Sequence, residues 1–309
     1  MAGQELHPHS DSPHPRRRPG HARRDEWVLG YLLILPLVLV ILLLVYIPLL
    51  RGFSMSLHLL DYSQGLTNQF TGLRNYLHVI QDPNTRRAAL NTSGYLVVTV
   101  VVELTAGVAF ALALKKPFRG RGLVLALMIL PWALPGIVSG VLWGRIYHPD
   151  TGFLNNILFR MGMIREYHLW FANRYLSIGM IALTNVWSGL PLVILILLAG
   201  LQTIPGEIYE AASVDGASAL RKFLGITLPL LRPSLVVALT LATVSSMSLF
   251  DQIYVLNGVA LETRSLTQQI YLMTFQQLKF GEGTALAFWL TLVLLCFSTG
   301  YIRSLRRAR

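Results

Sequence analysis

Polar side chains and tryptophans interrupt three long apolar stretches of this sequence. Asn185 and Trp187 lie in the string NVWSGLPL, Ser245 and Gln252 are the first and last residues of SSMSLFDQ, and Trp132 follows a proline in a third stretch. Amides and hydroxyls can hydrogen-bond the oxygens of a sugar ring, and the flat indole face can stack on its C–H surface. These five residues therefore supply the groups that sugar binding requires.

These side chains must converge from different elements. On one helix, Ser245, Leu249 and Gln252 have the spacing i, i+4, i+7, which predicts that they share a face. Pro131 and Pro135 predict a break in the helix that carries Trp132. An alternative is that the serines and glycines of these stretches only allow close helix packing, as small residues do in membranes.

The composition indicates a helical membrane protein. Of the 309 residues, 53% are hydrophobic and only 13% are charged, whereas soluble domains contain about 25% charged residues. Apolar runs of roughly 20 residues are long enough to cross a bilayer as helices. The formal net charge of +11 lies in short basic segments beside these runs, which favours the positive-inside pattern over nucleic-acid binding.

We predict an all-α protein with six transmembrane helices and with both termini in the cytoplasm. The spans are expected at about residues 27–50, 88–114, 123–147, 175–201, 233–256 and 284–302 of a transmembrane domain over residues 27–303. Residues 1–26, rich in Pro, His and Arg, are expected to form a disordered basic tail. Residues 304–309 are expected to form a second basic cytoplasmic tail.

The stretch EAASVDGASALRKFLGITLP lies in a polar loop over residues 203–232, between the fourth and fifth spans. A short helix is expected at Glu210–Ser213, a bend at Gly216, where positive φ costs nothing sterically, and a second helical turn at residues 218–225. Pro229 is expected to end that turn. Two short helices with one small face and one charged face suit insertion into a partner's cleft.

This loop resembles the cytoplasmic coupling loop of the membrane subunits of bacterial ABC importers, and the wider match, over about residues 27–303, resembles the maltose-type carbohydrate permeases. The residues that carry the motif, and that the resemblance assigns to ATPase coupling, are Glu210, Ala211, Ala212, Asp215, Gly216, Ile226, Leu228 and Pro229. The resemblance implies a type I importer permease fold. It also implies a second homologous permease subunit, two ATP-binding subunits and an external solute-binding protein as partners. The implied location of this chain is a bacterial cell membrane.

The resemblance also implies a set of substrate contacts. These contacts are Trp132, Gly136, Asn185, Ser188, Gly189, Leu192, Ser245, Leu249 and Gln252. The side-chain chemistry described above adds Trp187 to this set. Asn185, Gly189 and Ser245 keep the identity of the maltose pattern, whereas Trp132 and Leu192 replace tyrosines and Leu249 replaces an asparagine. A sugar-like solute other than maltodextrin is therefore implied.

Several other functions are less well supported. No G-x-x-x-x-G-K-S/T, metal-ligand spacing or catalytic constellation occurs, so we predict a transport subunit rather than an enzyme, with ATP and Mg²⁺ held by the partner ATPase. The alternatives are a permease for glycerol-3-phosphate or its diesters and an ion-driven secondary transporter. A phosphate would favour Arg or Lys in the cavity, and secondary transport would favour inverted repeats and charged residues at the midplane.

Two further ionisable residues lie in apolar stretches. Glu103 could line the solute pathway, and the favoured alternative is that it is protonated or pairs with a neighbouring helix. Asp251 could orient Gln252 or meet the external binding protein. Ionisable residues inside a membrane usually face a cavity or the interior of a helix bundle.

Overall fold

The computed structural model describes residues 19–62 and 68–306, and the chain divides into two units, residues 1–52 and 53–309. Within the first unit, a continuous helical run begins at Pro19, so residues 19–26 are helical and the prediction of disorder is wrong there; residues 1–18 lie outside the described part. The run consists of α1 (Pro19–Ile41), the π-helical turn η1 (Leu42–Tyr46) and α2 (Ile47–Ser56), which extends into the second unit.

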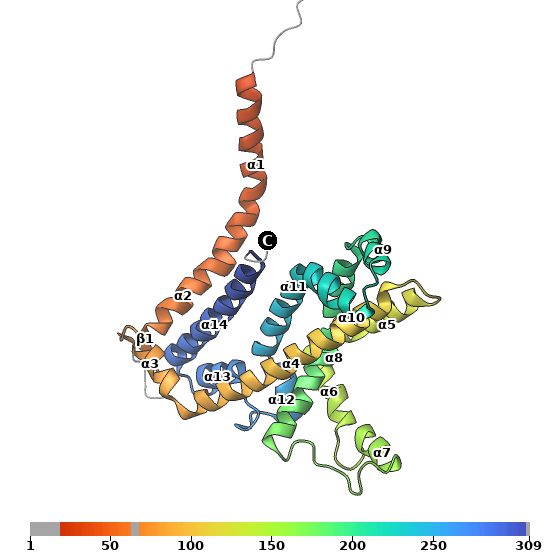
Figure 1. Cartoon of the computed structure of the whole chain (residues 1–309). Helices are drawn as coiled ribbons and strands as arrows, with labels where there is room; N and C mark the ends of the chain where they lie inside the picture. The colour runs from red at the N-terminus through yellow and green to blue at the C-terminus, as the bar shows by residue number, and fades with distance from the viewer. Residues whose placement is uncertain (1–18, 63–67, 307–309) are drawn as a thin grey trace, which may run out of the picture. The chain divides into compact units, whose positions relative to one another are not determined.

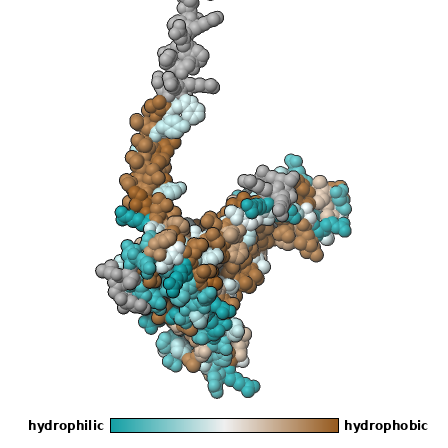
Figure 2. Space-filling model, turned by 90° about the vertical axis from the view of Figure 1, so that its left-hand side faces the viewer, coloured by the Kyte–Doolittle hydropathy of each residue, from teal (hydrophilic) through white to brown (hydrophobic). Residues whose placement is uncertain are grey.

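The first helix is apolar around its whole circumference. Its side chains from Trp27 to Leu50 are almost all exposed, for example Leu44 at 72%, and hydrophobic residues cover nearly all of its visible face (Figure 2). A helix that is hydrophobic on all sides requires an apolar environment, which lipid or another transmembrane helix provides.

The second unit contains the remaining elements, most of them helical (Figure 1). They are β1 (His58–Leu60), β2 (Asn68–Phe70), α3 (Arg74–Gln81), α4 (Pro83–Lys115), α5 (Arg121–Ala133), α6 (Gly136–Ile146), α7 (Phe153–Arg160), α8 (Arg174–Gln202), α9 (Gly206–Val214), α10 (Ala219–Lys222), η3 (Phe223–Thr227), α11 (Leu228–Met247), α12 (Asp251–Asn257), α13 (Leu266–Tyr271), η4 (Leu272–Gln276) and α14 (Phe280–Arg306). The two strands pair antiparallel, with His58 opposite Phe70.

Among the described residues, five helical runs are long and apolar enough to span a membrane, and a sixth span results if the bent pair α5 and α6 counts as one. This number agrees with the predicted all-α fold. The bend of 101° between α5 and α6 lies at Leu134 and Pro135, where the sequence predicts a break. The last helix continues to Arg306, so part of the predicted C-terminal tail is helical.

Two helix limits in the structure differ from the predicted ones, and each difference has a physical reason. α4 begins at Pro83, before the predicted residue 88, because Asp82 caps it: Asp82 Oδ2 accepts from Thr85 N at 2.7 Å and from Thr85 Oγ1 at 2.9 Å. A side-chain cap of this kind satisfies backbone N–H groups that lack a partner in the helix.

Pro229 does not end the helix before it, contrary to the prediction. The wider π-helical turn η3 precedes it, with Leu228 N–H bonded to Phe223 O, and α11 continues directly. Pro48 follows η1 with the same spacing. A proline ring clashes with the carbonyl four residues earlier in a regular helix, and a π turn immediately before the proline accommodates it.

Helix α8 forms the centre of the second unit and packs against α4, α5 and α11 (Figure 1). Its apolar core includes Val193, Leu197 and Leu201. A Cβ at Gly107 of α4 would lie 2.7 Å from Val193 Cγ1, so glycine there lets the two helices approach closely. The helices α9 and α10 lie beyond the C-terminal end of α8, and α7 lies at the other end (Figure 1).

Candidate functional site

Most of the predicted substrate contacts line one cavity of about 320 Å³ beside α8. They are Trp132, Gly136, Asn185, Ser188, Gly189, Leu192, Ser245 and Gln252. A second cavity of about 220 Å³ shares Gly136, Asn185, Ser245 and Gln252 with the first and adds Leu249. The two cavities therefore form a continuous site between α4, α5, α6, α8, α11 and α12.

Trp187 is the predicted contact that the structure does not bring to these cavities. Its ring lies 5.7 Å from that of Trp143, edge to face. Asn185, Ser188, Gly189 and Leu192 are spaced i, i+3, i+4, i+7 and share one face of α8, whereas a residue at i+2 points away from that face. Helical spacing alone therefore separates Trp187 from the site.

The break between α5 and α6 delivers an indole and a small residue to the cavity. Trp132 lies in the last turn of α5 and remains 50% exposed, while Gly136 opens α6. Leu134 N–H bonds to Pro131 O at 3.3 Å and Ser139 N–H bonds to Pro135 O at 3.1 Å. The break therefore retains local backbone hydrogen bonds while its side chains face the site.

A second break, between α11 and α12, brings Ser245, Leu249 and Gln252 together. The prediction that they share a face of one helix is wrong, because α11 ends at Met247 and α12 starts at Asp251. Ser265 Oγ donates to Leu249 O at 2.7 Å and Thr267 Oγ1 donates to Met247 O at 3.2 Å. Carbonyls freed in an apolar environment need such partners, so two side chains before and within α13 stabilise the break.

Three glycines of α6 hold it against α12. A Cβ at Gly136 would lie 2.7 Å from Asp251 Oδ2, and one at Gly140 would lie 2.9 Å from Val255 Cβ. Gly144 continues this face beside Leu256. The glycine face lets the two short helices approach closely, which places Gly136 and Gln252 in the wall of the same cavity.

The amide of Asn185 is oriented by long hydrogen bonds. Ser245 Oγ donates to Asn185 Oδ1 at 3.3 Å, and Asn185 Nδ2 donates to Thr99 Oγ1 at 3.5 Å. The Gln252 amide makes no hydrogen bond to another described residue. Both Asn185 hydrogen bonds are longer than the usual value near 2.9 Å, and the Gln252 amide has no partner among the described residues. Both amides can therefore form hydrogen bonds to a solute.

The sequence left the roles of Glu103 and Asp251 open, and the structure places both at the site. Glu103 lines the larger cavity and Asp251 the smaller one. No ion pair between described residues includes Glu103, so none of these residues provides the expected ionic partner from a neighbouring helix. Neither cavity is lined by Lys, Arg or His.

The residues predicted to couple to an ATPase lie on α9, at the turn after it, and on η3 and α11. Glu210, Ala211, Asp215 and Gly216 are exposed; the partly buried members are Ala212, Ile226, Leu228 and Pro229. Gly216 has φ +73°, so the expected left-handed bend is present. The first of the two short helices of this loop, α9, is longer than predicted and extends from Gly206 to Val214.

Contacts that the sequence did not reveal anchor this loop. Lys115 Nζ at the end of α4 lies 4.2 Å from the centre of the Tyr209 ring, and Tyr209 Oη lies 3.0 Å from Thr227 Oγ1. The outer surface carries large apolar side chains, Val214 at 89% and Leu220 at 66% exposure. The loop is thus a firmly held projection with an apolar surface at its tip.

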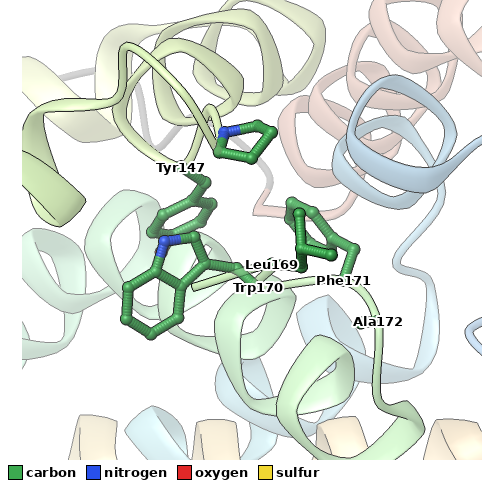
Figure 3. A pocket seen from close by; sticks show the side chains of 6 residues that line it. Tyr147, Leu169, Trp170, Phe171 and Ala172 are labelled. Atoms are coloured by element: carbon green, nitrogen blue, oxygen red, sulfur yellow. The ribbon is translucent and has the colours of Figure 1, made fainter. Parts of the chain in front are cut away.

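A third pocket of about 260 Å³ lies at the N-terminal end of α8, opposite to the end that carries α9. It shares no residue with the two cavities that contain Asn185. Figure 3 shows the rings of Tyr147 and Trp170 close together, with Phe171 across from them. Tyr147 Oη donates to Met180 O at 3.2 Å, whereas Trp170 Nε1 is buried without a described partner. Half of the residues that line this pocket are aromatic, and it is distinct from the two cavities that Asn185 and Gln252 line.

Comparisons with known proteins agree with this architecture. The family model for the "binding-protein-dependent transport system inner membrane component" matches residues 103–306. The trehalose/maltose transport system permease protein MalF of Thermococcus litoralis is 37% identical over 90% of this chain and 94% of its own length. The sulfoquinovosyl glycerol transport system permease protein SmoG of Agrobacterium fabrum is 34% identical over 90% and 91%.

A solved structure shows the same fold. One chain of a bacterial alginate ABC transporter, in complex with alginate pentasaccharide-bound periplasmic protein, superposes with a TM-score of 0.78. The match covers 94% of this chain and 98% of that chain at 21% sequence identity. At this identity the likeness concerns the fold.

Proposed function

The chain belongs to the family of binding-protein-dependent transport system inner membrane components, and we propose that it imports a di- or oligosaccharide delivered by an external solute-binding protein. As a member, it is a multi-pass permease of an ABC importer. The observation that carries the sugar assignment is the cavity in which the Asn185 and Gln252 amides, the Ser188 and Ser245 hydroxyls and the Trp132 indole converge. Amides, hydroxyls and an aromatic face are the groups that bind sugars.

The lining argues against a phosphorylated solute. Phosphate binding usually uses Arg or Lys, and neither residue lines the two cavities. The permease named for trehalose and maltose transport, at 37% identity, has two neutral sugars in its name. Trehalose and maltose are therefore the first solutes to test.

One of the two proposed ATP-binding subunits is proposed to dock on α9 and the turn that follows it. Val214 and Leu220 give this projection an exposed apolar surface. Exposed apolar patches are a feature of protein–protein interaction sites. Because no phosphate-binding loop occurs in the sequence, ATP and Mg²⁺ would bind to those partners, which would perform the hydrolysis. A bacterial plasma membrane is the proposed location.

A second, homologous permease subunit is proposed to complete the translocation pathway. The cavity of this chain is open, and the first helix presents an apolar surface on all sides. Movement of the ATPases would be transmitted through α9, which is held to α4 by the Lys115–Tyr209 contact. The breaks at Pro135 and at Ser248–Phe250 provide places where the cavity wall can change shape.

The test is uptake of labelled trehalose and maltose into proteoliposomes containing this chain with its sister permease, its ATPase and its binding protein. We expect uptake only with internal ATP and with all components present. Uptake by the isolated chain that requires a proton gradient and no ATPase would instead establish secondary transport. ATP-dependent uptake of glycerol-3-phosphate without sugar uptake would establish the phosphate alternative.

A further inference from the structure

The carboxyl group of Glu103 has an unusual position on α4. The residue is 1% exposed, and Oε1 has no hydrogen-bond partner among the described residues. It nevertheless lines the same cavity as Asn185 and Gln252. A buried polar atom without a partner is unfavourable, so its position requires an explanation outside the packing of the described residues.

Helix α8 makes room for this carboxyl. Oε1 lies so close to Gly189 that a Cβ at that position would overlap it, and the Cβ would also lie 3.2 Å from Glu103 Cδ. Any larger residue at 189 would displace the Glu103 side chain. The close approach of the two residues therefore fixes the carboxyl at the cavity wall, one helical turn from Asn185.

Structural roles for the carboxyl find no support in this part of the chain. The three ion pairs found between described residues do not include Glu103. No group of three or more His, Cys, Asp and Glu side chains suited to a metal ion occurs among the described residues. A ligand that enters the cavity can supply the missing partner, because Glu103 lines the same cavity as Asn185 and Gln252.

We propose that Glu103 binds a hydroxyl group of the transported solute and, together with Asp251, makes the cavity selective for uncharged sugars over anionic ones. The proposal rests on the sugar-import function proposed above. An ionised carboxyl accepts hydrogen bonds from hydroxyls, and a protonated one both donates and accepts, so either form can bind a sugar. Among the described residues, the two carboxyls are the only ionisable groups that line the cavities, so these residues offer an anionic solute no opposite charge.

The test is equilibrium binding of labelled trehalose, labelled maltose and a labelled uronic-acid disaccharide to the purified complex of permease and ATPase subunits. The binding protein is left out, so that its own selectivity does not enter. Glu103→Gln preserves the shape of the side chain and removes its ability to ionise. Thr105→Ala is the matched control on α4, because the Thr105 hydroxyl is exposed and bonds to Val101 O of its own helix.

We expect Glu103→Gln to weaken neutral-sugar binding about tenfold, which corresponds to loss of one hydrogen bond between the carboxyl group and the sugar. The ratio of neutral to anionic binding should fall at the same time, whereas Thr105→Ala should leave both values unchanged. A purely structural role would lower the thermal midpoint without changing this ratio.

Two results would overturn the proposal in different ways. If the wild-type complex binds trehalose or maltose and Glu103→Gln has the same affinity and the same ratio, the Glu103 role is wrong while sugar import stands. If the wild-type complex binds none of the neutral sugars but binds the anionic one, both the Glu103 role and the assignment of neutral sugars are wrong.

Discussion

The hydroxyl of Ser245 donates a hydrogen bond to Asn185 Oδ1 across 3.3 Å, which joins the last turn of α11 to the middle of α8. The same amide reaches Thr99 of α4 at 3.5 Å. Three helices thus orient one amide at the cavity wall. Both bonds are long, so a solute hydroxyl can replace either of them at low cost.

Replacing Asn185 with Ala should therefore weaken solute binding more than it weakens the fold. We expect a loss of about 1–1.5 kcal/mol in binding, or roughly tenfold in affinity. Equilibrium binding of labelled trehalose or maltose to the assembled importer measures this loss. Thr299→Ala is the control, because that exposed hydroxyl bonds only to carbonyls of α14, and equal affinities for the two variants would contradict the role of Asn185.

Ser265 should matter for the site although it lies outside the cavities. Its hydroxyl donates to Leu249 O at 2.7 Å at the break between α11 and α12. Ser265→Ala leaves that buried carbonyl without this donor, which costs about 1–3 kcal/mol, and frees the segment that positions Gln252. We expect a lower thermal midpoint together with weaker sugar binding. Ser304→Ala, on an exposed hydroxyl that bonds to Tyr301 O, should change neither quantity.

The glycine face of α6 offers a direct test of the packing. A Cβ at Gly140 would come 2.9 Å from Val255 Cβ, and Gly140→Val adds still more volume there. We expect destabilisation by about 1–3 kcal/mol from overpacking, seen as a lower midpoint of thermal unfolding in detergent. Gly122→Ala is the matched control, since nothing lies within 4 Å of its Cβ, and its midpoint should stay unchanged or rise.

Local sequence was sufficient where a helix or its break depends on residues within it. The apolar run of α8 predicted residues 175–201, and the helix extends from Arg174 to Gln202. Pro131 and Pro135 revealed the break between α5 and α6 because proline disrupts the helical hydrogen bonds locally. The cavity residues on α8 followed from their common face.

Distant contacts decided what the sequence did not reveal. No proline or glycine lies between Met247 and Asp251, and the break there depends on Ser265 and Thr267, which are many residues away. The approach of Glu103 to Gly189 likewise joins two helices that no local pattern relates. Tertiary packing overrides local preference at such positions.

Gly216 should be required for coupling because of its backbone conformation. Its φ is +73°, and a residue with a Cβ pays about 1–2 kcal/mol there. We expect Gly216→Ala to lower sugar-stimulated ATP hydrolysis by the importer, and Gly216→Asn to retain more of it, since Asn tolerates this conformation. Gly225→Ala, in the same loop with open space around its Cβ, should leave the activity unchanged. Equal activities for the Ala and Asn variants would show that conformation is not the cause.

Val214 should be central to docking of the ATPase subunit. It is 89% exposed at the end of α9. Full burial of such an apolar side chain by a partner stabilises the complex by about 1.5–3 kcal/mol. Val214→Asp replaces that gain with the cost of burying a charge, so we expect loss of ATPase co-purification while the thermal midpoint of the permease stays the same. Met161→Asp is the matched control: Met161 is 67% exposed and follows α7 at the other end of α8. Co-purification that falls equally for both variants would indicate a general effect of the added charge, and co-purification unaffected by Val214→Asp would exclude this surface as the ATPase site.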